Sequence, residues 1–290
     1  MNYLSKITYA FLCIFVVLVF VSCENLNPES IQEDQEEISK AVAEISEAQQ
    51  SFSASFSTMN EAVRQMDDLN GFTGPLIAQN RGCDNVELVL DPINTFPALV
   101  VMDFGDNCTQ NGHSFTGKME ATFNGSLFEE GKGMMLTFTN YTVDGYGIQG
   151  IYEVRNQGNN ANNQFNSEHT ISAGMLTDQD GNEFSYSGVT TSTLIEGQET
   201  DWKTDGQAGL DDDVWQEEED GVYVNSEGVE YTIKTTTPTL RAINCEIPIS
   251  GVVEFDSETL SAPITIDFGN GDCDRKVNVS FGFLSFEMDL

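Results

Sequence analysis

The chain has 290 residues, and its 47 aspartates and glutamates against 12 lysines and arginines give a formal net charge of −35 at pH 7. A chain this acidic repels phosphate, which excludes nucleic acid as a natural partner, and it should not lie flat on anionic lipid. A hydrophobic content of 39 %, with 19 phenylalanines, is enough for a packed core and argues against wholesale disorder. The acids are interpreted as solvated surface, with a calcium or cationic-glycan role for some of them as the alternative.

An apolar run lies near the N-terminus. It extends from Ile7 to Val21, is interrupted only by Thr8 and follows Lys6. A membrane-spanning helix needs about 20 residues, so this shorter run favours the apolar part of a signal peptide. A short membrane anchor and an ordinary secretory signal are the alternatives.

The run ends in Phe20-Val21-Ser22-Cys23. This resembles a lipobox, in which small residues precede a cysteine that receives diacylglycerol before cleavage, although Phe20 stands where leucine is usual. We therefore predict a signal peptide over residues 1–22 and a lipidated tether over 23–30. Cleavage would remove one lysine and no acid, which lowers the net charge to −36. Several acyl chains on Cys23, palmitate among them, would anchor the chain stably, so we expect a cell-envelope lipoprotein of the outer membrane.

Residues 31–70 are predicted to form one long amphipathic helix. No glycine or proline occurs between Glu29 and Leu69, and Asn70-Gly71 supplies a stop. Apolar residues recur at helical spacing with one polar interruption, Gln49, while serine, glutamate and glutamine fill the other faces. Either this stripe lies on a sheet of the same chain, or it forms a coiled coil with a partner, or the segment is disordered. The stripe comprises Ile38, Val42, Ile45, Phe52, Phe56, Met59, Val63 and Met66.

Residues 80–290 are predicted to form a mainly β domain of ten or more antiparallel strands in meander order. The period of two is clearest at 120–123, 135–139, 150–154 and 231–234. The result would be a large sheet, a sandwich or an open barrel. Asn-Gly and Asp-Gly pairs accept positive φ and predict tight turns; they include 124–125, 144–145, 180–181 and 220–221. Residues 201–220 are an acidic excursion that holds Trp202 and Trp215.

Four cysteines remain beside Cys23 and the cysteine inside the signal: Cys83, Cys108, Cys245 and Cys273. An even count in an exported protein predicts two disulfides, and without a C-x-x-C pattern no zinc site is expected. Each sequential pair brackets two β runs. A hairpin folded at the midpoint, Thr95–Phe96 or Thr259, would place its cysteines opposite each other. We predict the pairs 83–108 and 245–273, with crossed connectivities and free thiols as alternatives.

Both predicted hairpins carry Asp-Phe-Gly before their second cysteine, at 103–105 and 267–269. A kinase interpretation fails because the accompanying Gly-rich loop, paired lysine and His-Arg-Asp are missing. In the structural interpretation, Phe104 lies in the core, Gly105 has positive φ and Asp103 caps the turn. Acids and amides alternate at 270, 272 and 274 as in calcium loops, but the interval is too short for an EF-hand, and no metal is predicted.

Two C-terminal segments, SGVVE at 250–254 and ITIDFGNGDCD at 264–274, resemble the C-terminal signature of a family of uncharacterised Bacteroidota envelope lipoproteins. Stretches at 136–145, 193–197 and 231–238 fit the same family, and the acidic cluster at 211–220 departs from it. The resemblance implies an envelope lipoprotein with no known reaction. No catalytic residue can be carried over from it.

No catalytic or cofactor-binding pattern is found. His113 and His169 have no neighbouring metal ligands and are interpreted as surface or hairpin histidines. No G-x-S-x-G elbow occurs, and a glycosidase pair of carboxylates cannot be nominated among 47 acids.

Three functional hypotheses follow. The first is a non-enzymatic envelope lipoprotein with a structural or binding role, its partner being the membrane or another envelope protein. The second is a carrier of lipid or another apolar ligand, in which the helix lies against a curved sheet. The third is a glycan-binding or glycan-active protein, which would use Trp202 and Trp215.

Overall fold

A computed structural model describes residues 28–67, 88–91 and 96–290, except 111, 126, 128, 201–204, 206–208 and 246. The predicted signal peptide, Cys23 and most of the predicted tether lie outside the described residues. The chain divides into two units, Met1–Lys40 and Ala41–Leu290. The second unit contains the whole sheet and most of the helix. In the part of the chain that is described, no helix is both long enough and apolar enough to cross a membrane.

One long helix, α2, spans Pro28–Asp67. It begins three residues before the predicted start, within the predicted tether. Proline is well suited to the first turn of a helix, because the missing N–H would have no intrahelical partner there. No glycine or further proline interrupts the helix, so its 40 residues continue unbroken.

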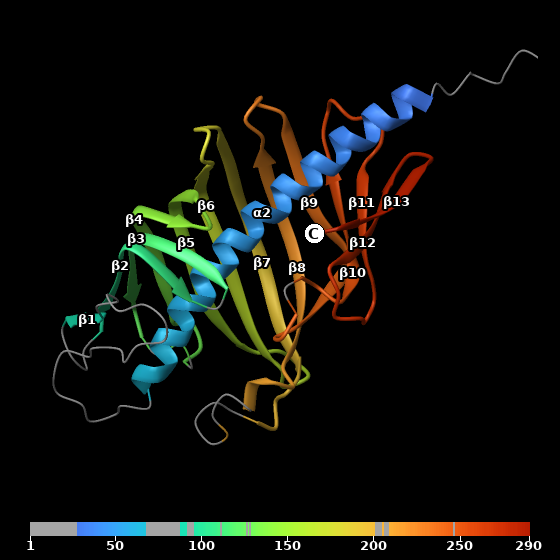
Figure 1. The fold of residues 1–290 in the computed structure, drawn as a ribbon. Coiled ribbons are helices and arrows are strands. Elements are labelled where there is room, and N and C mark those ends of the chain that lie inside the picture. The colour runs from blue at the N-terminus through green and yellow to red at the C-terminus, as the bar shows by residue number, and fades with distance from the viewer. Residues whose placement is uncertain are drawn as a thin grey trace, which may run out of the picture. The chain divides into compact units, whose positions relative to one another are not determined.

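The helix buries its predicted apolar stripe at Ile38, Val42, Ile45, Phe52 and Met59 and half-buries Phe56, while the side chains of Val63 and Met66 lie outside the description. From Ala41 onward α2 lies on the sheet of its own chain (Figure 1). This confirms the first of the three interpretations, a helix that lies on the sheet. Serines do lie beside the stripe, but only some are exposed, such as Ser53 and Ser57, because the buried face is wider than the stripe. Small side chains let the helix approach the strands closely on both sides of the stripe; those buried are Ala41, Ser46, Ala48, Ser51, Ala54, Ser55 and Thr58.

The sheet has thirteen strands, and each strand pairs antiparallel with the next in the chain. The predicted meander is therefore confirmed. Among the described residues β1 and β13 have no pairing with each other, so the sheet is open. Its strands are β1 Leu88–Asp91, β2 Ala98–Gln110, β3 His113–Phe123, β4 Gly133–Val143, β5 Tyr146–Asn159, β6 Phe165–Thr177, β7 Glu183–Glu196, β8 Val214–Val224, β9 Glu230–Ala242, β10 Ser250–Asp256, β11 Ile264–Asn270, β12 Lys276–Phe281 and β13 Leu284–Asp289.

Three of the four predicted turns lie between strands. Asp144 and Gly145, for example, join β4 to β5 with φ of 51° and 89°. The prediction at 220–221 is wrong, because both residues lie inside β8. There Gly221 pairs across the strands with Gly188, and a Cβ on Gly188 would lie 3.2 Å from the Gly221 Cα. Glycine is used here for close approach of two backbones. The acidic excursion is also shorter than predicted, since β8 begins at Val214.

Both predicted hairpins form about their predicted midpoints. Leu88 pairs with Met102, which centres the first on residue 95, and Phe255 pairs with Ile264 in the second. The second is closed by the predicted disulfide Cys245–Cys273, with 5.5 Å between Cα atoms. In the first, Cys108 is buried in β2, while Cys83 lies outside the described residues.

Replacing both Cys245 and Cys273 with serine should lower the free energy of unfolding by about 3–4 kcal/mol. The bond closes a segment with a sequence separation of 28 in the unfolded chain, which restricts that chain's conformations. Urea denaturation under non-oxidising and non-reducing conditions measures the change. As a control, Ser261→Ala in the exposed turn of the same hairpin should change stability by less than about 0.5 kcal/mol. Equal stability of the parent and the double serine variant would contradict the expectation.

The two Asp-Phe-Gly segments have the predicted structural role. Asp103 accepts a hydrogen bond at 3.0 Å from the Gly105 N–H, and Asp267 accepts one at 2.9 Å from the Gly269 N–H. Both glycines have positive φ. Phe104 is fully buried. In each motif the strand is therefore locally irregular, and the aspartate side chain satisfies the N–H of the glycine two residues later.

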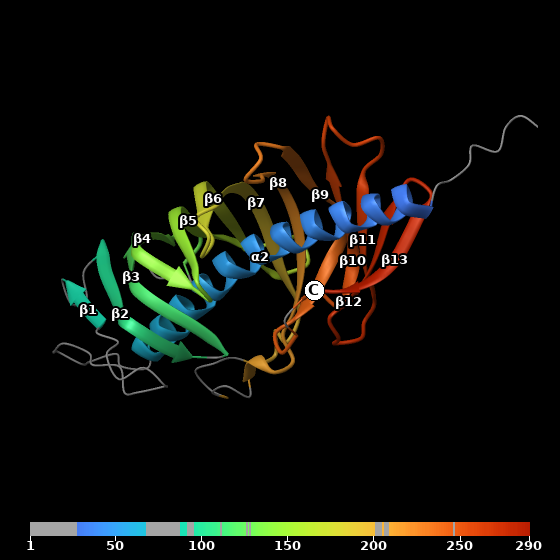
Figure 2. The ribbon, with the colours of Figure 1, turned by 45° about the horizontal axis from the view of Figure 1, so that its top comes forward.

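The strands from β3 to β9 curve around α2, as the two views of the ribbon show (Figures 1 and 2). Their helix-facing side holds the core of this unit. Phe52 of the helix lies at its centre, with its ring 6.0–6.4 Å from those of Phe138, Tyr152 and Tyr186. Gly174 of β6 leaves room for this ring, because a Cβ there would lie 3.0 Å from Phe52 Cζ.

Candidate functional site

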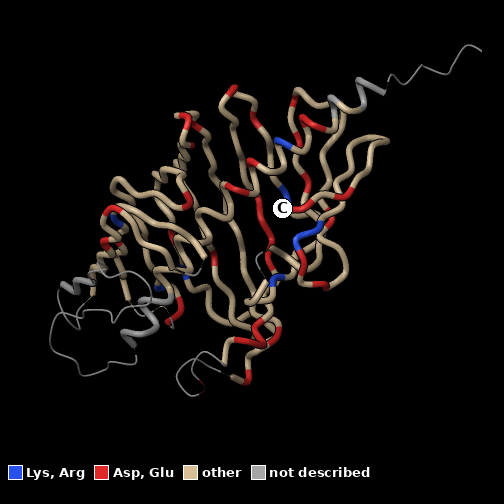
Figure 3. Tube along the Cα trace, in the orientation of Figure 1, with Lys and Arg blue, Asp and Glu red and all other residues tan. Residues whose placement is uncertain are grey.

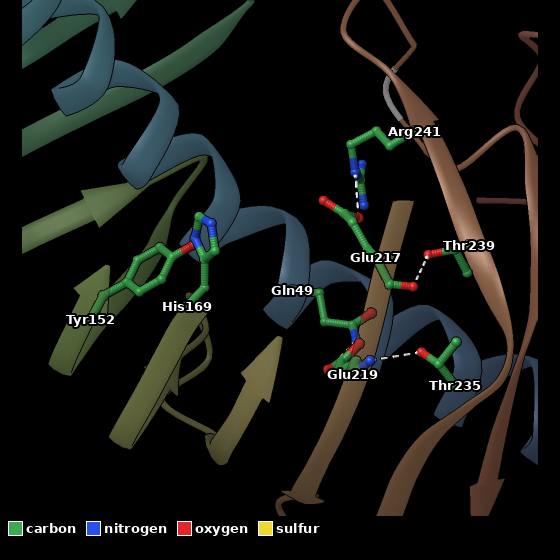
Figure 4. A network of polar contacts seen from close by, with 8 residues as sticks. All are labelled: Gln49, Tyr152, His169, Glu217, Glu219, Thr235, Thr239 and Arg241. Atoms are coloured by element: carbon green, nitrogen blue, oxygen red, sulfur yellow. Dashed lines mark hydrogen bonds and ion pairs between the residues drawn. The ribbon is translucent and has the colours of Figure 1, made fainter. Parts of the chain in front are cut away.

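The one polar residue in the helix stripe meets a carboxylate of the sheet. Gln49 Nε2 donates to Oε1 and Oε2 of Glu219, at 2.8 Å each, and the two side chains face each other between α2 and β8 (Figure 4). The Tyr186 hydroxyl of β7 also donates to Glu219 Oε1. The half-buried carboxylate of Glu219 therefore accepts hydrogen bonds from two side chains. We call Gln49, Tyr186 and Glu219 the Glu219 cluster.

The strands place this carboxylate through an irregularity in their pairing. The register of β8 with β9 shifts between Glu217 and Asp220, opposite a stretch that contains Pro238, which has no N–H for the ladder. The Glu219 N–H is satisfied by Thr235 Oγ1 instead, at 2.9 Å. Glu217 and Glu219 alternate with exposed Glu218 along β8, so they lie on the helix-facing side.

Burial controls the protonation equilibria of this cluster. It raises the pKa of Glu219, while the hydrogen bonds from Tyr186 and Gln49 act in the opposite direction. Burial, followed by the charge of Glu219, raises the pKa of the Tyr186 phenol well above its ordinary value. Tyr186 therefore remains a hydrogen-bond donor throughout the physiological range.

The sheet register aligns two polar rows on the helix-facing side of β5–β9. One row runs through His169, Thr190 and Glu219. The second is buried over most of its length, and its members are Asn156, Ser167, Ser192, Glu217 and Thr239. Glu217 is paired with Arg241, whose Nε lies 3.0 Å from Oε2 (Figure 4). Among the described residues, no buried side-chain nitrogen or oxygen lacks a hydrogen-bond partner.

His169 lies in the same region, on β6 beneath the helix. Its Nδ1 is 3.0 Å from the Tyr152 hydroxyl and its Nε2 is 3.0 Å from Ser167 Oγ. The ring of Phe56 packs edge-on against it at 5.1 Å. The interpretation of His169 as a surface or hairpin histidine is wrong. Serine and histidine resemble a nucleophile and its base, but the second ring nitrogen contacts a tyrosine rather than a carboxylate.

The stability of the protein should depend on His169 below pH 6.5. Burial lowers the pKa of His169 to about 4, whereas an unfolded histidine titrates near 6.5. The unfolded state therefore binds this proton first, so its stabilising contribution is complete above about pH 6.5 and is lost as the pH falls towards 4. Between pH 6.5 and 5 the expected loss is about 1–2 kcal/mol. Urea denaturation at several pH values measures it, and a His169→Gln variant should lose the dependence; an unchanged slope in that variant would contradict this assignment.

His113 is placed as its sequence setting predicted. It lies at the start of β3, and its Nδ1 is 2.6 Å from Asp144 Oδ2 in the exposed β4–β5 turn. Burial raises the pKa of Asp144, but hydrogen bonds from His113 and from Ser114 outweigh this and leave it below its ordinary value. The pair joins two neighbouring turns of the sheet.

Two further contacts fix the helix at either side of Gln49. The hydroxyls of Ser55 and Tyr141 are 3.1 Å apart and buried. The Tyr223 hydroxyl donates to Glu44 Oε2 at 3.3 Å. Together with Gln49, these contacts define both the position of the helix along the sheet and its rotation.

The other predicted residues do not join this region. Trp215 lies in β8 and packs edge-on against Phe165, with ring centroids 6.1 Å apart, while Trp202 lies outside the described residues. Asp274, in the possible calcium stretch, caps a turn by accepting from the Lys276 N–H at 3.1 Å. In the described residues no group of three or more His, Cys, Asp and Glu side chains is placed to hold a metal ion.

Sequence reasoning missed Glu219, Tyr186 and Arg241, because none belongs to a recognisable motif. The interruption at Gln49 was the available signal, since a buried amide requires a polar partner. Both carboxylate oxygens of Glu219 accept hydrogen bonds from within the chain. The Glu219 cluster therefore connects the helix to the sheet and does not offer a free acid or base to a substrate. Comparisons of the chain with known protein families, curated proteins and solved structures find no match.

Proposed function

We propose that this chain is a non-enzymatic envelope protein, anchored in a membrane by lipid on Cys23, with a structural or binding role. The observation that carries the non-enzymatic part is the occupation of the helix-facing side of the sheet by the chain's own helix. Val42, Ile45, Phe52 and Met59 are all buried there. Tyr186 donates to Glu219, and the Tyr152 hydroxyl lies 3.0 Å from His169 Nδ1.

The anchor is supported by the sequence at the N-terminus. The apolar run from Ile7 to Val21 is followed by Ser22-Cys23, and its length is too small for a spanning helix. The disulfide Cys245–Cys273 fits an oxidising compartment outside the cytoplasm. The resemblance of residues 250–274 to Bacteroidota envelope lipoproteins points the same way.

Metabolic labelling with a fatty-acid analogue tests the anchor directly. The parent protein should incorporate the label and partition into detergent, whereas Cys23→Ala should do neither. Cys13→Ala, which changes only the cysteine inside the apolar run, is the matched control and should behave as the parent does. An unlabelled parent protein, or equal partitioning of Cys23→Ala, would overturn the proposal.

A carrier of lipid or another apolar ligand is the second candidate. It is favoured by the curvature of β3–β9 around an apolar stripe (Figure 2). A ligand in this region would have to share or replace the contacts of Phe52 and its neighbours. Native mass spectrometry distinguishes the candidates: a carrier should release a bound lipid of defined mass, and the structural protein should give the mass of the chain with its own anchor alone.

A further inference from the structure

The last hairpin of the sheet ends in an exposed apolar tip. Gly282 and Phe283 join β12 to β13, and Phe281 pairs with Leu284 directly below them. The Phe283 side chain is 75 % exposed, more than any other large hydrophobic residue in the described chain. We call residues 281–284 the hairpin tip.

The turn itself does not require phenylalanine. Gly282 supplies the positive φ of 55°, and the second position of a two-residue turn is ordinarily served by small or polar residues. Nor does Phe283 add to the core, since most of its surface is in solvent. The Phe283 ring is therefore available for a contact outside the chain.

The β12–β13 hairpin carries no charge near its tip. No charged residue occurs from Val277 to Phe286, in a chain of which 20 % is charged. The charged residues of this hairpin, including the pair Lys276 and Glu287, lie at its opposite end. Figure 3 shows the loop between β12 and β13 without acidic or basic residues, whereas acids are spread over the rest of the sheet.

The helix contacts indicate from which side the chain enters this unit. Ser55 contacts β4, Gln49 contacts β8 and Glu44 contacts the far end of β8. Within Ala41–Leu290 the helix therefore begins over β8, in the half of the sheet that ends in β13, and runs towards β4. Ala41 lies 18 positions after Cys23. Because α2 begins at Pro28, this connection reaches about 40 Å, of which about 20 Å is helix.

We propose that the hairpin tip contacts the bilayer that holds the lipid on Cys23, and so forms a second point of attachment. This inference rests on the proposed lipid anchor. The apolar ring of phenylalanine in the tip would be buried at the boundary between headgroups and acyl chains, as Trp, Phe and Leu are in interfacial segments. Asp256 and Glu258 in the neighbouring β10–β11 turn would oppose anionic lipid. The contact is therefore expected to be confined to the tip and to favour zwitterionic lipid.

Tryptophan substitutions test the contact in the full mature lipoprotein. Phe283→Trp reports on the tip, and Phe96→Trp is the matched control, because Phe96 is the other strongly exposed phenylalanine, at 56 %, and lies between β1 and β2. Each variant is reconstituted with phosphatidylcholine vesicles, with and without brominated acyl chains. Emission of the parent, which has two tryptophans, is subtracted.

The added emission of Phe283→Trp should shift to shorter wavelength on reconstitution and lose most of its intensity with brominated lipid. That of Phe96→Trp should be unchanged. If the protein floats with the vesicles in a density gradient but neither variant is quenched, the contact is overturned and the anchor is not. Failure to float would overturn both proposals. A shift that follows protein concentration without vesicles would assign the tip to a second copy of the chain, and would also overturn the contact.

Discussion

Replacing Glu219 with alanine should lower the free energy of unfolding by about 2–4 kcal/mol. The variant leaves the Gln49 amide and the buried Tyr186 hydroxyl without their shared acceptor in the half-buried region between α2 and β8. Leaving such groups without a partner costs far more than the small net gain from forming a hydrogen bond. Urea denaturation followed by circular dichroism measures the change.

Glu218→Ala is the matched control, because Glu218 is exposed on the opposite side of the same strand. It should change stability by less than about 0.5 kcal/mol. Glu219→Gln should lie between the two, because its amide still offers an acceptor to Tyr186. Equal effects of the alanine variants at 218 and 219 would show that Glu219 has no special place in the fold.

Replacing Phe52 with alanine should have the larger effect, a loss of about 3–5 kcal/mol. Its ring is fully buried and contacts rings from three strands of the sheet. The cavity cannot be filled by collapse of β6, because Gly174 has no side chain to move into it. The same denaturation experiment applies.

Ser53→Ala is the control for this variant, since Ser53 is exposed on the same turn of α2. It should leave stability within about 0.5 kcal/mol of the parent. If Phe52→Ala were equally mild, the helix from Ala41 onward would not be part of the folded core.

The elements that could be predicted from the sequence are those with local, repetitive signals. The apolar stripe predicted α2 because its spacing follows the helical period, and the alternation at 120–123 predicted β3 for the same kind of reason. The two hairpins followed from the positions of Pro97, Thr259 and the cysteines around them. The meander order then followed from the assumption that each strand pairs with the next strand in the chain.

What the sequence did not predict depends on contacts between distant residues. Glu219 is one of three successive glutamates, and it faces Gln49 because side chains alternate along β8 and Gln49 of the distant helix lies opposite it. Asp220-Gly221 has the sequence of a tight turn, but Gly221 lies inside β8 and pairs with Gly188 of β7. That pairing cannot be recognised from the sequence around either glycine. Ser55 is buried because the sheet curves around the helix. The sequence of the helix does not reveal how strongly the sheet is curved.

The width of the buried helix face has the same origin. A helix on a flat surface buries one stripe, whereas a helix inside a curved sheet also buries the flanking positions. Alanine and serine fill those positions because larger side chains would push the strands away. The residues that remain exposed, such as Ser53 and Ser57, point away from the sheet.

A double-mutant cycle between Gln49 and Glu219 tests most directly whether α2 is held in the sheet by this contact. The free energies of unfolding of Gln49→Ala, Glu219→Ala and the double variant are compared with that of the parent. A coupling energy of about 1–2 kcal/mol is expected for this pair, while Gln49→Ala combined with Glu218→Ala should be additive. Additive effects of Gln49→Ala and Glu219→Ala would contradict the arrangement of helix and sheet described above.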